Sequence, residues 1–362
     1  MSSVIGVDLG GTKVVVAGLR GREMMDDSLL EPTDRSGSGA LIDQLVAMVG
    51  RIRPDDLTAV GIGVPSVVEF ETGRVVSSVN IPLRDVPLRQ VLGERLGVPV
   101  FVDNDATVAA LAEAHDTNLR LVARNLVMLT VGTGLGGGIV LGGRIYRGAT
   151  GGAGEFGHTV IGLRLDGAAP VPAPSERFPQ PPSLEYAASG HGLDRLAAQA
   201  ADENPDSALG ELKAKGTPVL GAEAVEAAHA GDPVAKRTVE IWAERVGIGV
   251  ANAINTFDPE EVVIGGGAAR AGELLLEPAR RVALGYVVPG LGRGTNIRLA
   301  WHGVRAGVLG AALLAAQEAE ARSDASSARS DVSSASPAGQ AGSFTNSSDG
   351  RQLGAHEEAS GS

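Results

Sequence analysis

Three consecutive polar residues, Asp103, Asn104 and Asp105, lie where an apolar segment gives way to an Ala- and Leu-rich one. Residues 99–102 are predicted to form a short buried strand and residues 106–114 a helix. In α/β folds, ligands bind at the rim of the sheet where such junctions lie. A carboxylate there is held ionised by the helix N-terminus and can accept a proton. The alternative is helix capping, for which Asp and Asn are preferred.

A glycine-rich turn near the N-terminus is the second segment whose residue types suit chemistry. The flanking residues 4–8 and 14–17 are apolar and predict two strands. Backbone N–H groups, a hydroxyl and an ammonium group can together hold phosphate oxygens. Asp8, at the end of the first strand, could hold Mg²⁺ directly or through water. A Gly-Gly pair is also a hairpin signal without any ligand. The turn consists of Gly10, Gly11, Thr12 and Lys13.

The second half of the chain repeats this plan of strand, Gly/Thr loop and strand. Residues 125–131 are predicted to be a buried strand, residues 132–138 a loop and residues 139–141 the next strand. Two such hairpins could hold a polyphosphate from both sides. The loop nearly spells the G-x-G-x-x-G dinucleotide motif, but that motif opens a helix, and a strand follows here. The expected phosphate contacts are Gly132, Thr133 and Gly134.

Two further segments could contribute to a site. Glu155 and His158 lie three residues apart in glycine-rich backbone and could both contact a ligand. If they do not, Glu155 is a solvated glutamate and His158 a hydrogen-bonded structural histidine. Three glycines at 265–267 separate a predicted strand over 261–264 from a predicted helix over 273–283. A ligand can lie against backbone at such a junction, although a tight turn would need the same residues.

The remaining segments supply the scaffold. Strands and helices alternate in the first half, which predicts a mixed or parallel sheet. Residues 165–182 contain six prolines and are predicted to be irregular. The other predicted helices cover residues 41–52, 87–96, 233–257 and 304–321, and the other predicted strands cover residues 58–64 and 296–300.

Composition limits the classes of function. The net charge of −12 argues against nucleic acid or an anionic membrane as partner. The absence of cysteine excludes disulfides, a thiol nucleophile and cysteine-based metal sites. No apolar run approaches the roughly 18 residues that span a bilayer, and no signal peptide is evident, so we expect a cytoplasmic protein. Residues 322–362 are rich in Ser, Ala, Gly and Asp and predict a disordered tail.

Five segments in this order resemble the ROK family of sugar kinases, within the actin-like and hexokinase-like ATPase superfamily. The resemblance extends from about residue 4 to about residue 317. It implies an α/β fold with two domains, each on a mixed five-stranded sheet, around a central cleft. The segments are 8–13 (DLGGTK), 103–106 (DNDA), 132–138 (GTGLGGG), 154–158 (GEFGH) and 264–267 (IGGG). The expected parts are an N-terminal domain over 1–120, a C-terminal domain over 121–303 and a helix over 304–321 that returns to the N-terminal domain.

The resemblance also assigns roles. Asp105 matches the catalytic base that takes the proton from a sugar hydroxyl as it attacks the γ-phosphorus of ATP. Phosphoryl transfer needs mainly positioning and charge neutralisation, so one base and two phosphate loops suffice, with Mg²⁺ near Asp8. The expected sugar contacts are Asn104, Asp105, Glu155, His158, Glu185, Ser66 and Asn80, and the adenosine-side loop is Gly265, Gly266 and Gly267.

The chain departs from the family pattern at two places. The family usually holds zinc with the histidine at 158 and three cysteines, but here the last cysteine position is Ser183 and no cysteine exists. We therefore expect no zinc site, and His158 must be oriented by a carboxylate, a carbonyl or packing from residues 167–182. The second departure is Ser66, where the family usually has glycine.

Several alternatives stay open at this stage. Glucose is the leading substrate, and N-acetylmannosamine, fructose and allose are the others considered. Polyphosphate-using glucokinases also lack the zinc cysteines. A non-catalytic sugar sensor is disfavoured by the retained Asp105, and a repressor by the absence of a helix-turn-helix segment. We also expect a homodimer or homotetramer.

Overall fold

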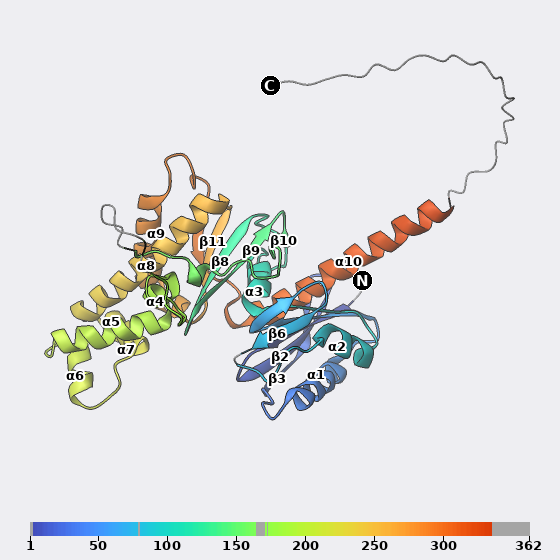
Figure 1. Cartoon of the computed structure of the whole chain (residues 1–362), viewed down its shortest axis with the longest axis horizontal. Coiled ribbons are helices and arrows are strands. Elements are labelled where there is room, and N and C mark those ends of the chain that lie inside the picture. The colour runs from blue at the N-terminus through green and yellow to red at the C-terminus, as the bar shows by residue number, and fades with distance from the viewer. Residues whose placement is uncertain (1–2, 79, 164–170, 172, 335–362) are drawn as a thin grey trace, which may run out of the picture. The chain divides into compact units, whose positions relative to one another are not determined.

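The computed structural model describes residues 3–78, 80–163, 171 and 173–334. The described residues divide into two units, with the boundary between Glu320 and Ala321. The first unit contains two five-stranded sheets built on the same plan (Figure 1). This confirms the predicted α/β class with mixed sheets. Among the helices that are described, none is long and apolar enough to cross a membrane.

The first sheet has the strand order β3-β2-β1-β4-β7. Strands β1, β2 and β3 are antiparallel neighbours, whereas β1, β4 and β7 are parallel, so β1 and β7 end at the same edge. Helices α1 and α2 pack on this sheet. The bounds are β1 Ser3–Leu9, β2 Lys13–Arg20, β3 Glu23–Pro32, α1 Ser38–Ile52, β4 Leu57–Val64, α2 Leu88–Leu96, β7 Val100–Asn104 and α3 Asp105–Glu113, with a small hairpin of β5 Ser66–Glu69 and β6 Arg74–Ser78.

The second sheet repeats this arrangement as β10-β9-β8-β11-β12. Strands β8 and β9 are antiparallel, and β8, β11 and β12 are parallel. The predicted start of α8 is confirmed, because Asp232 accepts a hydrogen bond from the Ala235 N–H and Pro233 is the first helical residue. The bounds are β8 Leu126–Val131, β9 Leu135–Leu141, β10 Arg144–Ile145, η1 Phe156–His158, α4 Leu184–Ala188, α5 Gly190–Glu203, α6 Ala208–Ala214, α7 Gly221–Ala230, α8 Pro233–Phe257, β11 Glu261–Gly265, η2 Gly267–Ala271, α9 Glu273–Tyr286, β12 Asn296–Leu299 and η3 Gly303–Arg305.

One strand and part of another differ from the prediction. Strand β3 was not predicted, because it is an edge strand with mostly exposed side chains and no buried alternation. Strand β9 begins at Leu135, so the predicted loop over 132–138 is limited to Gly132–Gly134. A Cβ added at Gly138 would lie 2.6 Å from the Ala110 Cβ and 2.7 Å from the Ala106 carbonyl oxygen. Glycine there allows close packing of β9 on α3.

The last helix, α10 (Ala306–Ser334), packs at close range on the first sheet and on α3. A Cβ added at Gly6 of β1, Gly61 of β4 or Gly310 of α10 would collide with backbone atoms of Val308, Ala311 or Val108, respectively.

The helix continues to Ser334, so the prediction of disorder from residue 322 is wrong up to that point. Residues 322–334 contain more Ser than Ala, and they extend a helix that has already formed, which costs less than starting a new one. Residues 335–362 lie outside the described residues, and the domain boundaries near 120 and 303 stay predictions.

Replacing Gly61 with Ala will destabilise the protein, because the new methyl group collides with the Ala311 carbonyl oxygen. Overpacking of this kind costs about 1–3 kcal/mol. The matched control is Gly50→Ala in α1, where an added Cβ meets nothing within 4 Å and helix propensity favours Ala by about 1 kcal/mol. Urea unfolding midpoints of both variants measure the effect. Equal midpoints would show that α10 does not pack on β4 as described.

Candidate active site

The strand-to-helix junction at residues 103–105 combines capping with an available carboxylate. Asn104 is the N-cap of α3, and its Oδ1 accepts hydrogen bonds from the N–H groups of Ala106 and Thr107 at 2.9 and 3.2 Å. Its Nδ2 donates to the Ser66 carbonyl oxygen at 3.3 Å. Asn104 is therefore the capping residue. The Asp105 carboxylate accepts from the Ala106 N–H at 2.8 Å and is not needed to cap the helix.

Asp105 and Asp8 form a pair of interacting carboxylates at one edge of the first sheet. Asp105 directly follows β7, and Asp8 is the last but one residue of β1. Both strands lie beside β4 and run parallel to it, so the two residues lie at the same edge of the sheet. Burial, with a smaller contribution from the Asp8 charge, raises the pKa of Asp105 to about 6 against the lowering effect of the Ala106 N–H. Burial also raises the pKa of Asp8, and the charge of Lys13 opposes this. A carboxylate with a pKa near neutrality suits general-base chemistry.

The start of α10 closes one side of this carboxylate pair. A Cβ added at Gly307 would lie 2.5–2.8 Å from the carboxyl atoms of Asp8. Only glycine therefore leaves room for the observed position of the Asp8 side chain. Sequence reasoning missed Gly307, because nothing local to it indicates a contact with the first strand.

The first glycine loop is braced by a residue that sequence reasoning also missed. The Gly10 N–H donates to the Lys13 carbonyl oxygen at 2.9 Å. The hydroxyl of buried Thr33 donates to the Gly10 carbonyl oxygen at 2.7 Å, and the Thr33 N–H donates to the Thr12 carbonyl oxygen at 3.1 Å. The side chains of Thr12 and Lys13 remain exposed. Asn80 lies beside this loop, since a Cβ added at Gly11 would be 3.0 Å from the Asn80 Cβ.

The start of α5 and Glu185 support the second glycine loop, Gly132–Gly134, from one side. The Gly190 N–H donates to the Gly132 carbonyl oxygen at 2.7 Å. Glu185 Oε2 accepts from the Leu135 N–H at 2.7 Å and would lie 2.7 Å from a Cβ at Gly134. A Cβ at Gly132 would meet nothing within 4 Å. The loop thus presents backbone on its open side, and Glu185 is committed in part to supporting it.

The third glycine segment lies next to the second loop, because β8 and β11 are parallel neighbours with Gly265 opposite Thr130. Gly266 has a φ of 79° and packs against Val131, so a side chain would be strained there. A Cβ at Gly267 would meet nothing within 4 Å. The second and third predicted ligand-binding segments are therefore brought together.

Glu155 and His158 are exposed and lie close to each other. Glu155 Oε2 is 3.8 Å from His158 Nε2. The ring of Phe178, from the proline-rich segment, packs edge-on against the His158 ring with 5.5 Å between centroids. Of the three expected means of orienting His158, loop packing is present through Phe178, whereas the Glu155 carboxylate is nearby but beyond hydrogen-bond distance. Among the residues that the structure describes, no group of three or more His, Asp or Glu side chains could hold a metal ion.

Asp103 has a structural role that the sequence did not reveal. Its buried carboxylate accepts from Arg147 Nε at 2.7 Å and from the Asn104 N–H at 2.9 Å. The Arg147 guanidinium stacks on Phe70 at 3.4 Å and lies 3.5 Å from Glu318 of α10. These contacts fix the residue that precedes the N-cap of α3. Nearby, the Ser66 hydroxyl is buried and has no hydrogen-bond partner among the described residues.

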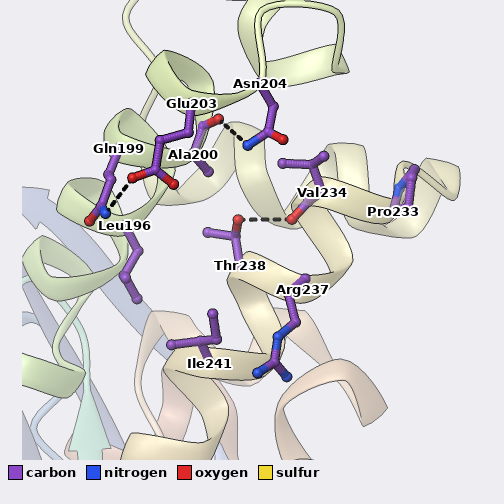
Figure 2. A pocket seen from close by; sticks show the side chains of 10 residues that line it. All are labelled: Leu196, Gln199, Ala200, Glu203, Asn204, Pro233, Val234, Arg237, Thr238 and Ile241. Carbon is purple, nitrogen blue, oxygen red and sulfur yellow. Dashed lines mark hydrogen bonds between the residues drawn. The ribbon is translucent and has the colours of Figure 1, made fainter.

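A hollow of about 330 Å³ between α5 and α8 lies outside this site (Figure 2). Its polar side chains are paired locally: the Thr238 hydroxyl donates to the Val234 carbonyl oxygen at 2.8 Å, and Asn204 Nδ2 donates to that of Ala200 at 2.9 Å. None of the predicted site residues lines it. We assign it no role.

Comparison with known proteins matches residues 4–318 to the ROK family. A glucokinase of Halalkalibacterium halodurans is 36% identical over 326 residues, which cover 87% of this chain and 95% of that enzyme. The crystal structure of a ROK family glucokinase from Streptomyces griseus in complex with glucose and AMPPNP has a TM-score of 0.68 and 33% identity, covering 87% of this chain and all of that one. A ROK hexokinase from Thermus thermophilus has a TM-score of 0.69 and 34% identity, covering 88% and 99%.

The raised pKa of Asp105 predicts a specific pH dependence of stability. Between the ordinary value of 3.8 and about 6, the unfolded chain ionises this carboxyl while the folded chain keeps it protonated. Stability therefore falls as pH rises through this window, by roughly 2–3 kcal/mol at about 1.4 kcal/mol per pKa unit. Asp105→Asn removes this loss, so the variant gains stability relative to the wild type between pH 4 and pH 7 in urea unfolding.

The control for this measurement is Asp34→Asn, which should show the opposite trend. Hydrogen bonds from the Ser36 hydroxyl and N–H lower the pKa of Asp34. Its stabilising contribution is present above the ordinary pKa and is lost as pH falls. A constant difference between Asp105→Asn and the wild type across this range would contradict the assigned environment of Asp105.

Proposed function

The chain belongs to the ROK family, and we propose that it transfers the γ-phosphoryl group of ATP to the 6-hydroxyl of glucose. The observation that carries this proposal is the Asp105 carboxylate, which has a pKa of about 6 and stands at the start of α3. Strand β9 runs from the second glycine loop past the first turn of α3, since a Cβ at Gly136 would be 3.7 Å from that of Ala106. The base is therefore flanked by the phosphate-binding elements of both sheets.

In the proposed reaction, Asp105 accepts the proton of the sugar hydroxyl as its oxygen attacks the γ-phosphorus. The bond from that phosphorus to the β–γ bridging oxygen breaks, and the electron pair leaves with ADP. At neutral pH a base with a pKa of about 6 is largely ionised and ready to accept. The sugar leaves as its phosphate monoester, and the proton on Asp105 is released to solvent.

The glycine segments supply the ATP contacts. The Gly11 backbone and the exposed side chains of Thr12 and Lys13 suit the phosphates from the first sheet, and the Gly10 N–H closes the turn by donating to the Lys13 carbonyl oxygen. Gly132–Gly134 form the corresponding loop of the second sheet, within which the Gly132 N–H donates to the Gly134 carbonyl oxygen at 2.9 Å. Gly265–Gly267 are assigned to the adenosine side. The open backbone faces at Gly132 and Gly267 support this assignment.

Mg²⁺ fits the Asp8 position. A partly buried carboxylate whose pKa burial raises, beside a second carboxylate, gains from a divalent cation that offsets their repulsion. When bound, the metal would neutralise charge on the transferred phosphoryl group. Gly307 keeps the Asp8 carboxylate at this place by leaving it room.

The sugar contacts surround Asp105. Asn104 uses its oxygen for the α3 cap and donates an amide N–H to the Ser66 carbonyl oxygen. Its side chain also interacts with the Asp105 carboxylate, so it lies directly beside the proposed base. Polar groups of this kind reject a sugar that lacks the matching hydroxyl. Glucose and ATP are favoured because the Streptomyces griseus relative is in complex with glucose and AMPPNP. The remaining proposed contacts are Glu155, His158, Glu185, Ser66 and Asn80.

The proposal is tested by ADP release across a panel of hexoses and N-acetylhexosamines. ATP and polyphosphate are offered as donors in parallel. Glucose with ATP should give the highest kcat/KM. A panel in which no sugar releases ADP above background would refute kinase activity, and a preference for polyphosphate would refute the proposed donor.

Asp105→Asn should abolish turnover while leaving glucose binding largely intact. The amide keeps the hydrogen-bonding shape but cannot accept the proton, and loss of a general base costs about 10²–10⁴-fold in rate. In the wild type, kcat/KM should rise with pH up to about 6 and then level off, because only the ionised carboxylate accepts the proton. Asp206→Asn, an exposed carboxylate outside the site, is the control. Half of wild-type kcat in Asp105→Asn would show that another residue is the base.

Activity should not depend on zinc. With no cysteine in the chain, we attribute the orientation of His158 to packing against Phe178, with the Glu155 carboxylate 3.8 Å from its Nε2. A zinc-selective chelator in excess Mg²⁺ should therefore leave kcat unchanged, while His158→Ala raises the KM for glucose. Phe178→Ala should raise the same KM by a smaller factor, because it loosens the histidine without removing it. Stoichiometric zinc by elemental analysis, lost together with activity, would contradict this account.

A further inference from the structure

A second hollow, of about 760 Å³, lies away from the proposed site, at the two places where the chain passes between the sheets. One wall is the segment between α3 and β8, and another is the segment between β12 and α10. The turn between β2 and β3 completes it. We call it the arginine hollow and define it by Arg22, Arg120, Trp301, Arg305 and Leu309.

The arginine hollow concentrates positive charge in an acidic protein. Its three guanidinium groups are exposed, and none has a carboxylate within 4.0 Å among the described residues. Glu23 is the one acidic residue among the described residues that line it. Asp116 accepts hydrogen bonds from the backbone N–H groups of Asn118 and Arg120. These bonds and the nearby Arg120 charge lower the pKa of Asp116, so Arg120 is partly balanced by this carboxylate without an ion pair. With a net charge of −12 for the chain, this local excess of cations requires an explanation.

Trp301 supplies an aromatic surface beside these cations. The Arg298 guanidinium covers one part of its ring at 3.4 Å, yet 46% of the residue remains exposed. The CH groups of a sugar ring or another apolar face can pack on such a surface. Three guanidinium groups beside an aromatic ring therefore match a phosphate group joined to a small organic body.

The wall that carries Trp301 is rigid. The carboxylate of Glu113, at the end of α3 and fully buried, accepts from Arg298 Nη1 at 2.7 Å and from the N–H groups of Trp301 and His302 at 2.9 Å each. His302 Nε2 lies 2.9 Å from the His115 carbonyl oxygen. A wall fixed in this way loses little conformational entropy when a ligand binds.

We propose that the arginine hollow is a binding site for a small phosphate monoester, with Arg22, Arg120 and Arg305 around the phosphate and Trp301 beside the organic part. Guanidinium groups bind phosphate oxygens through paired charge-assisted hydrogen bonds. The volume lies in the range of ordinary ligand sites and exceeds that of a bare phosphate. The proposal rests on the hollow alone and is independent of the proposed kinase activity.

Tryptophan fluorescence of the full chain tests the proposal without any measurement of turnover. The chain has two tryptophans, and Trp242 is buried with its Nε1 donating to the Ala188 carbonyl oxygen at 2.8 Å. Trp301 is therefore the solvent-exposed reporter. Inorganic phosphate and glucose 6-phosphate are titrated separately, each against KCl at matched ionic strength. We expect a saturable change with glucose 6-phosphate that Trp301→Phe abolishes.

The variants Arg22→Gln and Arg120→Gln should each weaken this binding about tenfold to a hundredfold, because each removes a charged hydrogen-bond donor. Arg144→Gln, an exposed arginine of β10, is the control and should bind as the wild type does. Equal affinity for phosphate and glucose 6-phosphate would identify the phosphate alone as the recognised group. A signal that does not exceed that of KCl, or one that persists in Trp301→Phe or is unchanged in both arginine variants, would overturn the proposal.

Discussion

The close packing of backbone around helix α3 is the constraint on which the rest of the structure depends. Residues Thr107–Glu113 of this helix are all buried. Gly63 of β4, Gly138 of β9 and Gly310 of α10 approach it so closely that a methyl group on any of them would collide with it. Both sheets and the last helix therefore meet on α3 through glycine.

Helix α3 has a carboxylate at each end, and the two carboxylates lie in different surroundings. Asp105 at its start is only partly buried and is available for chemistry. Glu113 at its end is fully buried and is saturated by Arg298 and two backbone N–H groups. One end can thus face a ligand while the other fixes the helix to the segment after β12.

Side chains from distant parts of the chain contact His158 and Asp103. The proline-rich segment places Phe178 edge-on against the His158 ring. Asp103 forms an ion pair with Arg147, which also lies near Glu318. Elements from distant parts of the chain therefore hold the residues next to Asp105.

The sequence by itself determined many of the local elements and singled out the segments that we propose to carry chemistry. Hydrophobic patterning predicted β1, β4, β7, α3 and α8, and residue type and position singled out Asp8, Asp105 and the three glycine segments. Local patterns could not reveal that Gly136–Gly138 belong to a strand, or that β3 forms an edge. Nor could they pair Asp103 with Arg147 or place Gly307 against Asp8. Those features depend on which backbones approach one another across the fold, and only tertiary packing decides that.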